Sequence, residues 1–531
     1  MFVDKPVVPR HAIIGIVAVS LAAINSTLGA GLISVGLEDL RGAWGLGIDE
    51  AAYVPTAFNA AQMFIGPVSI MLAARFGHRQ VLLYAGAIYI LSSLILPLTP
   101  HIVPITFLLV LSGLSSGTFY PLCLSFIGRN LPLSLVTYGI AAYNLDLLAT
   151  NHIVQSLGGY YLEHASWHWL FWNQAIFSLP MLLCVYYGIP KTPKEQLLPA
   201  FSFAGIFYLS GALTLFYIAL DQGERLDWYN NGLINGLFWG GVILLAAAIT
   251  RRFRRPTPFL NFGYLKGRNV LLMGCLMLVF RAVLVRIGFV LPNFLEVVHQ
   301  YRPPDTGALF SLSVIPFLVA LPLVAYMMNR VRVRTILIMG FAILALINFR
   351  DAHLLSTWMR FEFIPTQMIG AIGICMVAMG TICGIVFVGR MSGAYRNREG
   401  AYAQGAFFQS VRLFGSVASV SAFRRFLLFR EHFWQTKLVS GIQPSLLLED
   451  RNATLGTALA PQAPGPAQAS ELGAGLSAHN IQVQSFSLAT ADTFMLLAWV
   501  SVLGLIAVSM MVRVPLPREL PDADAAPRPR K

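Results

Sequence analysis

Five polar or ionisable side chains interrupt one long apolar run of the sequence. The run covers about residues 136–161, and its part YNLDLLATNHIVQS carries Asn144, Asp146, Asn151, His152 and Gln155. At about 100° per residue, Asn144, Asn151 and Gln155 share one face of a helix, and Asp146 lies on the far side. Hydrocarbon solvates neither stripe. A helix with this pattern must therefore be wrapped by other helices or line an aqueous cavity.

Asp146 is the residue of this run whose chemistry is most informative. An ionisable group at membrane depth is by default a candidate for function, and a carboxylate there could take up and release a proton. Two other interpretations stay open: a structural ion pair or hydrogen-bonded interface, and a position nearer the membrane surface. For His152 the alternatives are a proton relay and a hydrogen-bonded packing residue.

Arginine side chains occur in two further apolar runs. Arg281 and Arg286 lie in the run 269–297, and their spacing of five residues turns them by about 140° toward different faces of a helix. One of them could meet an acidic partner while the other faces a cavity. In the run 402–423, Gln409 and Arg412 share a stripe. This excess of positive charge favours an anionic or carboxylate-bearing amphiphile over a cationic one.

Amide side chains in the first two apolar runs complete the set of candidates for a substrate cavity. Asn25 lies in the first run, and Asn59 and Gln62 lie in the second. The full set of cavity candidates is Asn25, Asn59, Gln62, Asn151, Gln155, Arg281, Arg286, Gln409 and Arg412, with Asp146 as the candidate for proton coupling.

The composition indicates a membrane protein, in which polar side chains within the spans must face other helices or a cavity. Of the 531 residues, 56% are hydrophobic and only 11% are charged, against about 25% charged in an ordinary soluble protein. A membrane-spanning helix needs about 20 mostly apolar residues. We identify fourteen such runs: 13–36, 51–74, 80–98, 102–127, 136–161, 168–189, 201–221, 231–249, 269–297, 305–328, 335–349, 363–389, 402–423 and 493–512.

The distribution of Lys and Arg predicts how these spans are oriented. Most of the basic residues fall in the loops on the side of the N-terminus, as the positive-inside rule requires of a cytoplasmic side. The net charge of +13 therefore orients the chain in an inner or plasma membrane, with both termini cytoplasmic, and does not indicate nucleic-acid binding. The first run has no cleavage site and is expected to be a retained span.

One outward loop, at about 426–491, is much longer than the others. Its first part, RRFLLFREHFWQTKL, suggests an amphipathic helix on the membrane surface. Its centre, ATLGTALAPQAPGPAQASELGAGLSAHN, is rich in Ala, Gly and Pro and is expected to be poorly ordered. Within the spans, the pairs Gly113 and Gly117 and Gly380 and Gly384 are spaced for close helix packing.

The motifs of soluble enzymes are absent from the sequence. It has no phosphate-binding Gly-Lys-Ser/Thr loop and no HExxH, and its Gly-x-Ser-x-Gly match at 113–117 lies inside an apolar run rather than at a strand-to-helix turn. We therefore expect no enzymatic activity, no catalytic residue, no cofactor and no metal site. Uphill work would have to come from ion gradients, which makes secondary transport the economical interpretation.

Several motifs resemble those of one transporter family. They are ARFGHRQVL at 74–82, LGGYYLEH followed by SWHWLFWNQAIFSLP at 157–180, ALDQGERLDWYNNGLI at 219–234, LPNFLEVVHQYRPPDTGALFSLSVIP at 291–316 and GAFFQSVRLFGSVASV at 405–420. They are similar to motifs of the fourteen-helix drug:proton antiporters of the major facilitator superfamily, the EmrB/QacA-like group. By this resemblance Arg75, Gly77 and Arg79 belong to the gating loop, and Arg412 stands where many relatives carry an Arg.

The resemblance implies an all-α polytopic membrane protein with the major facilitator fold, in which two six-helix bundles flank two extra central helices. The N-terminal bundle would span 1–198, the two-helix insert with its cytoplasmic linker 199–262, and the C-terminal bundle with the long outward loop 263–531. It also implies a substrate site between the bundles that works by alternating access. The implied partners are the lipid bilayer, a small-molecule substrate, protons and, in some resembling exporters, a periplasmic adaptor protein.

The sequence departs from the family pattern at charged and bend-forming positions. Ala74 replaces the usual Asp and Ile70 the usual Gly of the gating motif, and Leu109 stands where span four carries an Arg. Val154 and Gln155 replace Gly-Pro in span five, Asn25 stands in place of an Asp, and His168 in place of an Arg. These changes leave two alternatives to a proton-coupled multidrug exporter: a dedicated carrier of one metabolite class such as an organic anion, and a non-transporting scaffold, sensor or membrane enzyme.

Overall fold

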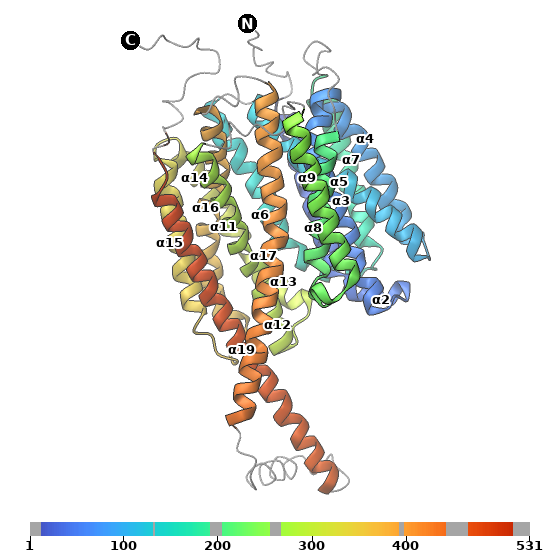
Figure 1. Ribbon diagram of the computed structural model, residues 1–531, viewed down its shortest axis with the longest axis vertical. Coiled ribbons are helices and arrows are strands. Elements are labelled where there is room, and N and C mark those ends of the chain that lie inside the picture. Colours follow the sequence, from blue (N-terminus) through green and yellow to red (C-terminus); the bar gives the residue numbers. More distant parts are fainter. Residues whose placement is uncertain are drawn as a thin grey trace.

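The computed structural model describes residues 12–130, 133–191, 204–254, 267–391, 398–441, 466–512 and 514. These residues form helices, and no strand occurs among them (Figure 1). The long helices of the first half are α1 (Ala12–Val35), α3 (Ile48–Phe76), α4 (His78–Ile95), α5 (Ile102–Asn130), α6 (Leu133–His164), α7 (Trp169–Gly188), α8 (Ala204–Gln222) and α9 (Gly232–Arg254). Those of the second half are α11 (Arg268–Val285), α13 (Pro303–Leu312), α14 (Val314–Met328), α15 (Val333–Asp351), α16 (Ile364–Met391), α17 (Arg398–Gly441) and α19 (Pro466–Ser509).

Twelve helices of the described chain are long and apolar enough to cross a membrane. They correspond to twelve of the fourteen predicted runs. The other two runs form α6 and α17, which have 32 and 44 residues and are therefore long enough, but their polar side chains lower their hydropathy. The protein is a multi-pass, all-helical membrane protein, and the crossing of α6 and α17 stays a prediction.

The helices pack in two groups that meet along two seams. In the first group α1 packs on α5, α6 and α7, and α3 on α5; in the second, α15 packs on α16 and α19, and α11 on α17. One seam joins α6 to α13 and α14, and the other joins α3 to α17. Helices α8 and α9 pack against each other, and α8 also contacts α3 and α17.

Backbone contacts along the first seam are close. A Cβ atom at Gly307 of α13 would lie 2.6 Å from the amide nitrogen of Ser156, and one at Gly159 of α6 would lie 2.9 Å from the nitrogen of Pro304. At the opposite end of α6, Asn329 Nδ2 donates to Thr137 Oγ1 at 3.1 Å. The seam therefore extends along most of α6.

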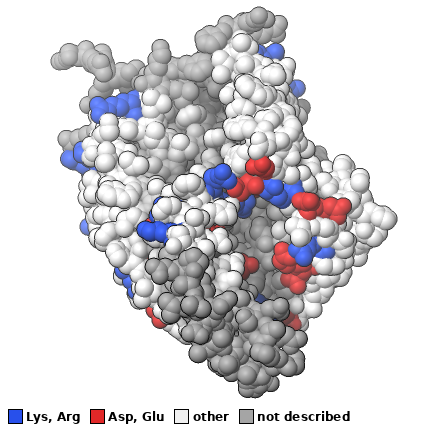
Figure 2. Space-filling model, turned by 60° about the horizontal axis from the view of Figure 1, so that its bottom comes forward, with Lys and Arg blue, Asp and Glu red and all other residues white. Residues whose placement is uncertain are grey.

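Charged side chains of both signs gather at the end of the molecule that carries α2 (Leu37–Trp44), as Figure 2 shows. Arg225, in the loop between α8 and α9, pairs with Asp49 in the first turn of α3. Its neighbour Glu224 pairs with Arg425 of α17 at 2.8 Å. This loop therefore bridges the two helices of the second seam.

The long outward loop differs from its prediction. Residues 424–438 do not form a separate helix on the membrane surface, because α17 continues without interruption from Arg398 to Gly441. Residues 466–480 also belong to a helix, the first part of α19, although the sequence suggested poor order there. Each helix is about 66 Å long at 1.5 Å per residue, about twice the hydrocarbon thickness, and both project beyond the helical body in Figure 1. Residues 442–465 lie outside the described chain.

The base of this projection is held by a polar contact and a small apolar cluster. Asp492 of α19 accepts from Arg430 Nε at 2.7 Å and from Trp434 Nε1 at 2.6 Å, both on α17. Leu427 and Phe486 pack together beside them. The two long helices are thus joined where they leave the body.

The paired glycines pack as predicted. A Cβ atom at Gly113 of α5 would overlap the carbonyl oxygen of Phe58 on α3, and one at Gly117 would lie 2.8 Å from Gln62 Cα. Gly380 packs on Leu337, and Gly384 on Met273. The small residues allow these helices to approach closely.

We expect Gly113→Ala to lower the stability of the purified protein by about 1–3 kcal/mol, because the added methyl group would push α5 away from α3. The readout is the midpoint of thermal unfolding in detergent. Gly236→Ala on α9 is the control, since no atom lies within 4 Å of its Cβ position. Equal midpoints for the two variants would contradict the packing argument.

Candidate functional site

Helix α6 is enclosed by other helices, as its two polar stripes require. It packs against α1, α5, α7, α13, α14 and α16. The stripe of Asn144, Asn151 and Gln155 faces the second group of helices: Asn144 Nδ2 donates to Met379 Sδ on α16 at 3.4 Å, and Gln155 Oε1 accepts from Thr306 Oγ1 on α13 at 2.8 Å. Asn151, between them, is exposed. The first stripe therefore lines the seam between the two groups.

The opposite stripe of α6 faces its own group. The carboxyl group of Asp146 is hydrogen-bonded by Ser20 of α1, and its Oδ2 atom is buried without a partner. No Lys or Arg of the described chain forms an ion pair with it. Within the part of the chain that the structure describes, Asp146 is thus a carboxyl group inside the helical bundle without a cationic partner.

Two arginines of the second group lie side by side. Arg281 Nη2 of α11 donates to Ser416 Oγ of α17 at 2.6 Å, and Arg412 Nε donates to Gln409 Oε1 at 3.0 Å. The Arg281 side chain packs beside Gly415, where a Cβ atom would lie 3.7 Å from its Cγ. Within the described residues, neither guanidinium forms an ion pair.

A pair of tyrosines connects Arg412 to α6. The Arg412 guanidinium lies 3.6 Å above the ring of Tyr120 on α5, and the rings of Tyr120 and Tyr143 are 4.7 Å apart. Tyr143 lies one turn before Asp146 on α6. The tyrosines therefore separate the two unpaired arginines from the unpaired carboxyl group.

These charged residues retain access to solvent although their helices are enclosed. Asp146, Arg281 and Arg412 are all partly exposed, and Asn151 is exposed. Because α6 packs against six other helices, we infer that this accessible surface lies between helices. We call this inferred region the polar space; two positive groups from one half and a carboxyl group from the other lie beside it.

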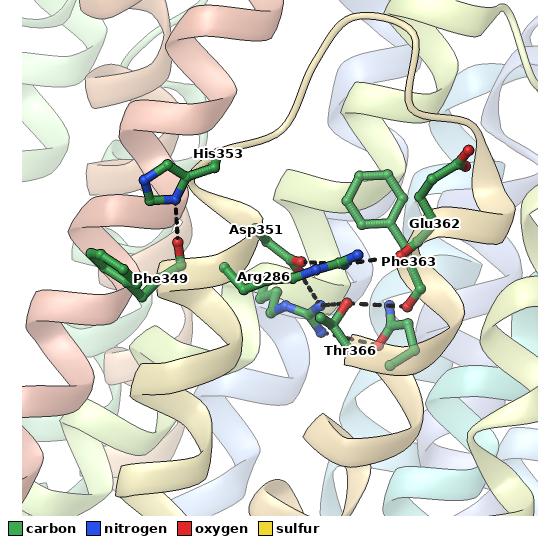
Figure 3. Close-up of polar contacts among 9 residues, drawn as sticks. Arg286, Phe349, Asp351, His353, Glu362, Phe363 and Thr366 are labelled. Atoms are coloured by element: carbon green, nitrogen blue, oxygen red, sulfur yellow. Dashed lines mark hydrogen bonds and ion pairs between the residues drawn. The ribbon is translucent and has the colours of Figure 1, made fainter.

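Arg286 does not reach this space. It begins a five-residue π-helical turn, Arg286–Val290, between α11 and α12 (Leu291–His299), and is 1% exposed. Its Nη2 atom pairs with Asp351 Oδ2 at 2.6 Å, and Arg350 Nη1 contacts the other carboxylate oxygen at 3.1 Å. Thr366 and Gln367 accept further hydrogen bonds from Arg286 (Figure 3). The expectation that one arginine meets an acidic partner is confirmed. Arg286 is sealed by this pair and does not line the inferred cavity.

The amide candidates of the first group also lie mainly between helices. Asn25 is 0% exposed and packs against Met181 of α7. Asn59 hydrogen-bonds Tyr217 of α8, and Gln62 Nε2 donates to Ser116 Oγ of α5 at 3.0 Å. Asn25 is therefore sealed in this structure, whereas Asn59 and Gln62 keep partial exposure.

The gating-loop candidates occupy a very short junction. Gly77 is the single residue between α3 and α4, and its φ of 87° lies in a region that glycine adopts without strain. Arg75, in the last turn of α3, stacks on Phe76, and Arg79 stacks on Tyr186 of α7 at 4.5 Å. The junction explains the glycine, and the gating role of the two arginines stays a prediction.

Sequence reasoning missed the two tyrosines and Asp351. Tyr120 and Tyr143 occur inside apolar runs, where an aromatic residue is ordinarily part of the core. Asp351 lies two residues beyond the predicted end of its span at 349, so it was assigned to a loop. The signal available for Asp351 was its position one turn after Asn348 on an extended α15.

Comparison with known proteins identifies the family. Residues 19–420 match the family described as the Major Facilitator Superfamily. The chain belongs to the major facilitator superfamily. It is a membrane transporter of that superfamily, and the resemblance inferred from its motifs is confirmed at low identity.

Curated relatives in this superfamily carry names of multidrug exporters. The chain is 25% identical over 359 residues to the "Probable multidrug resistance protein EmrY" of Escherichia coli. The matched region covers 66% of the chain and 67% of the relative. It is 23% identical over 332 residues to the "Multidrug export protein EmrB" of Haemophilus influenzae, covering 62% and 64%. The "Colistin resistance protein EmrB" of Acinetobacter baumannii is 22% identical over 356 residues, covering 66% and 69%.

Solved structures of the superfamily share the fold. The proton:xylose symporter XylE has a TM-score of 0.55 at 11% identity, covering 93% of the chain and 94% of XylE. The human organic anion transporter MFSD10 has a TM-score of 0.54 at 12% identity, covering 94% and 100%. At these identities the likeness concerns the major facilitator fold alone.

Proposed function

We propose that this protein is a proton-coupled secondary transporter that exports small amphiphilic compounds by alternating access. The observation that carries the proposal is the pairing of an uncompensated carboxyl group, Asp146, with a partly exposed polar space between two groups of helices. Taking up a proton removes the charge of a carboxylate from a poorly solvating interior, and losing the proton restores it. The names of the EmrY and EmrB relatives support export of varied compounds.

Alternating access would use the two seams as gates. The proposed bundles are residues 1–198 and 263–531, with 199–262 as the two-helix insert and linker. The α6 seam and the α3–α17 seam are the contacts that rocking would have to break and remake. The loop between α8 and α9, which contacts both α3 and α17, would then limit the opening at its end of the molecule.

We place the protein in the inner (plasma) membrane with both termini cytoplasmic, since its basic loops lie on that side by the positive-inside rule. The projecting parts of α17 and α19 would then be extracytoplasmic. In this orientation they are the part of the molecule that a periplasmic adaptor protein could reach.

Transport in proteoliposomes under an imposed pH gradient tests the proposal. Several structurally unrelated amphiphiles should accumulate against their gradients when protons flow the opposite way. Accumulation of a single compound and its close analogues alone would favour a dedicated carrier. No accumulation of any compound under either direction of the gradient would overturn proton-coupled transport and leave the scaffold or sensor interpretation.

A further inference from the structure

We propose that the space beside Arg281 and Arg412 binds amphiphilic anions, namely small molecules with an apolar aromatic body and one negatively charged group such as a carboxylate or sulfonate. This inference rests on the proposed transport function and names the substrate class. The two guanidinium groups hold the negative group, and the pair Tyr120 and Tyr143 contacts the aromatic body.

The protein leaves the positive charge at this place uncompensated. Arg281 and Arg412 are close enough to interact electrostatically, and no carboxylate of the described chain pairs with either of them. Asp146 is hydrogen-bonded to Ser20 on the other side of the tyrosines. Two like charges at this separation repel each other. A ligand with a negative group would relieve this repulsion, and a ligand with a positive group would increase it.

Both arginines keep hydrogen-bond donors available for a ligand. A guanidinium carries five N–H donors. Arg281 donates through Nη2 to Ser416, which leaves Nη1 without a partner within the described chain. Arg412 donates through Nε to Gln409, which leaves its terminal nitrogens. Planar forks of this kind recognise carboxylates and related oxyanions through two parallel hydrogen bonds.

The two tyrosines beside the arginines can contact an aromatic ring of a ligand. Tyr120 is held under the Arg412 guanidinium at 3.6 Å, and its ring is tilted by 54° against Tyr143. Tyrosine rings offer rigid apolar surface that favours offset or edge contact with another aromatic ring. A ligand whose charge lies at one end and whose ring lies at the other fits this division.

Substrate exchange across a vesicle membrane tests the inference without depending on proton coupling. We would load proteoliposomes with unlabelled compound and follow the entry of labelled 1-naphthalenesulfonate, a permanent anion, or of labelled N-methylquinolinium, a permanent cation of similar size. Fixed charges prevent a pH difference from redistributing the compounds by itself. Exchange of the sulfonate and little exchange of the quinolinium is the expected result.

Substitutions of Arg281 and Arg412 test whether these two side chains bind the sulfonate. Arg412→Gln and Arg281→Gln should each weaken binding of the sulfonate about tenfold or more, because each removes a charge-assisted hydrogen bond. Arg412→Lys keeps the charge but loses the fork, so its effect should be intermediate. Arg424→Gln, on the same helix and stacked on Phe289, is the matched control and should match the wild type.

The outcomes separate this inference from the proposed function. Exchange of quinolinium but not of sulfonate would overturn the anion site while leaving proton-driven export intact. Sulfonate exchange without any response to a pH gradient would leave the anion site standing and overturn proton coupling. Sulfonate exchange that is unchanged in both glutamine variants would overturn the assignment to Arg281 and Arg412. The comparison of the two compounds on the wild type needs no variant, so a variant that fails to fold does not remove the test.

Discussion

Replacing Asp146 with Asn should abolish proton-driven accumulation of substrate and reduce it to the level of protein-free vesicles. Asn has nearly the same shape as Asp and retains a group for the hydrogen bond to Ser20, but it takes up no proton at physiological pH. In the described chain Asp146 is the carboxyl group beside the polar space that has no cationic partner. Exchange of labelled for unlabelled substrate should persist, because exchange requires no net proton movement.

Glu362→Gln is the matched control for this experiment. Its side chain is exposed in the short turn before α16, and the same change of charge there should leave proton-driven accumulation at the wild-type level. An Asp146→Asn protein that still concentrates substrate when protons flow the other way would show that another group carries the proton.

Breaking the buried pair of Arg286 and Asp351 should cause the largest loss of stability of any single substitution considered. Asp351→Asn leaves the Arg286 charge buried without an ionic partner, which costs about 3–5 kcal/mol in comparable cases. The π-helical turn that begins at Arg286 would lose the contact that fixes it to α15 and α16. The readout is the midpoint of thermal unfolding in detergent.

Two further variants distinguish a structural pair from other causes. The double variant Arg286→Met with Asp351→Leu removes both charges and should recover much of the lost stability. Asp49→Asn breaks the exposed pair with Arg225, and there we expect about 1 kcal/mol or less. If Asp351→Asn unfolds at the same temperature as Asp49→Asn, the pair does not hold this part of the fold together.

The sequence predicted the parts of the fold that depend on long apolar runs. Each of the fourteen runs contains a helix of the structure, since a run of about 20 apolar residues leaves few alternatives. The spacing of Asn144 and Gln155 predicted a face directed at neighbours, and that face meets α16 and α13. The rotation between Arg281 and Arg286 likewise predicted their different surroundings.

Other features could not be predicted because they depend on contacts between distant segments. Asp351 became the partner of Arg286 only through the packing of α15 against the π-helical turn, 65 residues away in sequence. The length of α19 was missed because its Ala-rich and Gly-rich first part is compatible with both helix and loop. The length of α17 was missed because the amphipathic pattern of 424–438 fits a separate surface helix as well as the continuation of a span. The role of Tyr120 depends on its contact with Arg412. No local pattern around Tyr120 indicates this contact, because the two residues are far apart in the sequence.

The central claim is that the polar face of α6 lines a water-filled space between the two groups of helices. The most direct test is the reaction of a cysteine at Asn151 with a hydrophilic, membrane-impermeant thiol reagent, in a protein whose five native cysteines have been replaced. Leu323→Cys on α14, which is exposed on an apolar helix, serves as the lipid-facing control. We predict rapid labelling at 151, slowed by bound substrate, and no labelling at 323. No labelling at 151 from either side of the membrane, with or without a pH gradient, would contradict the account.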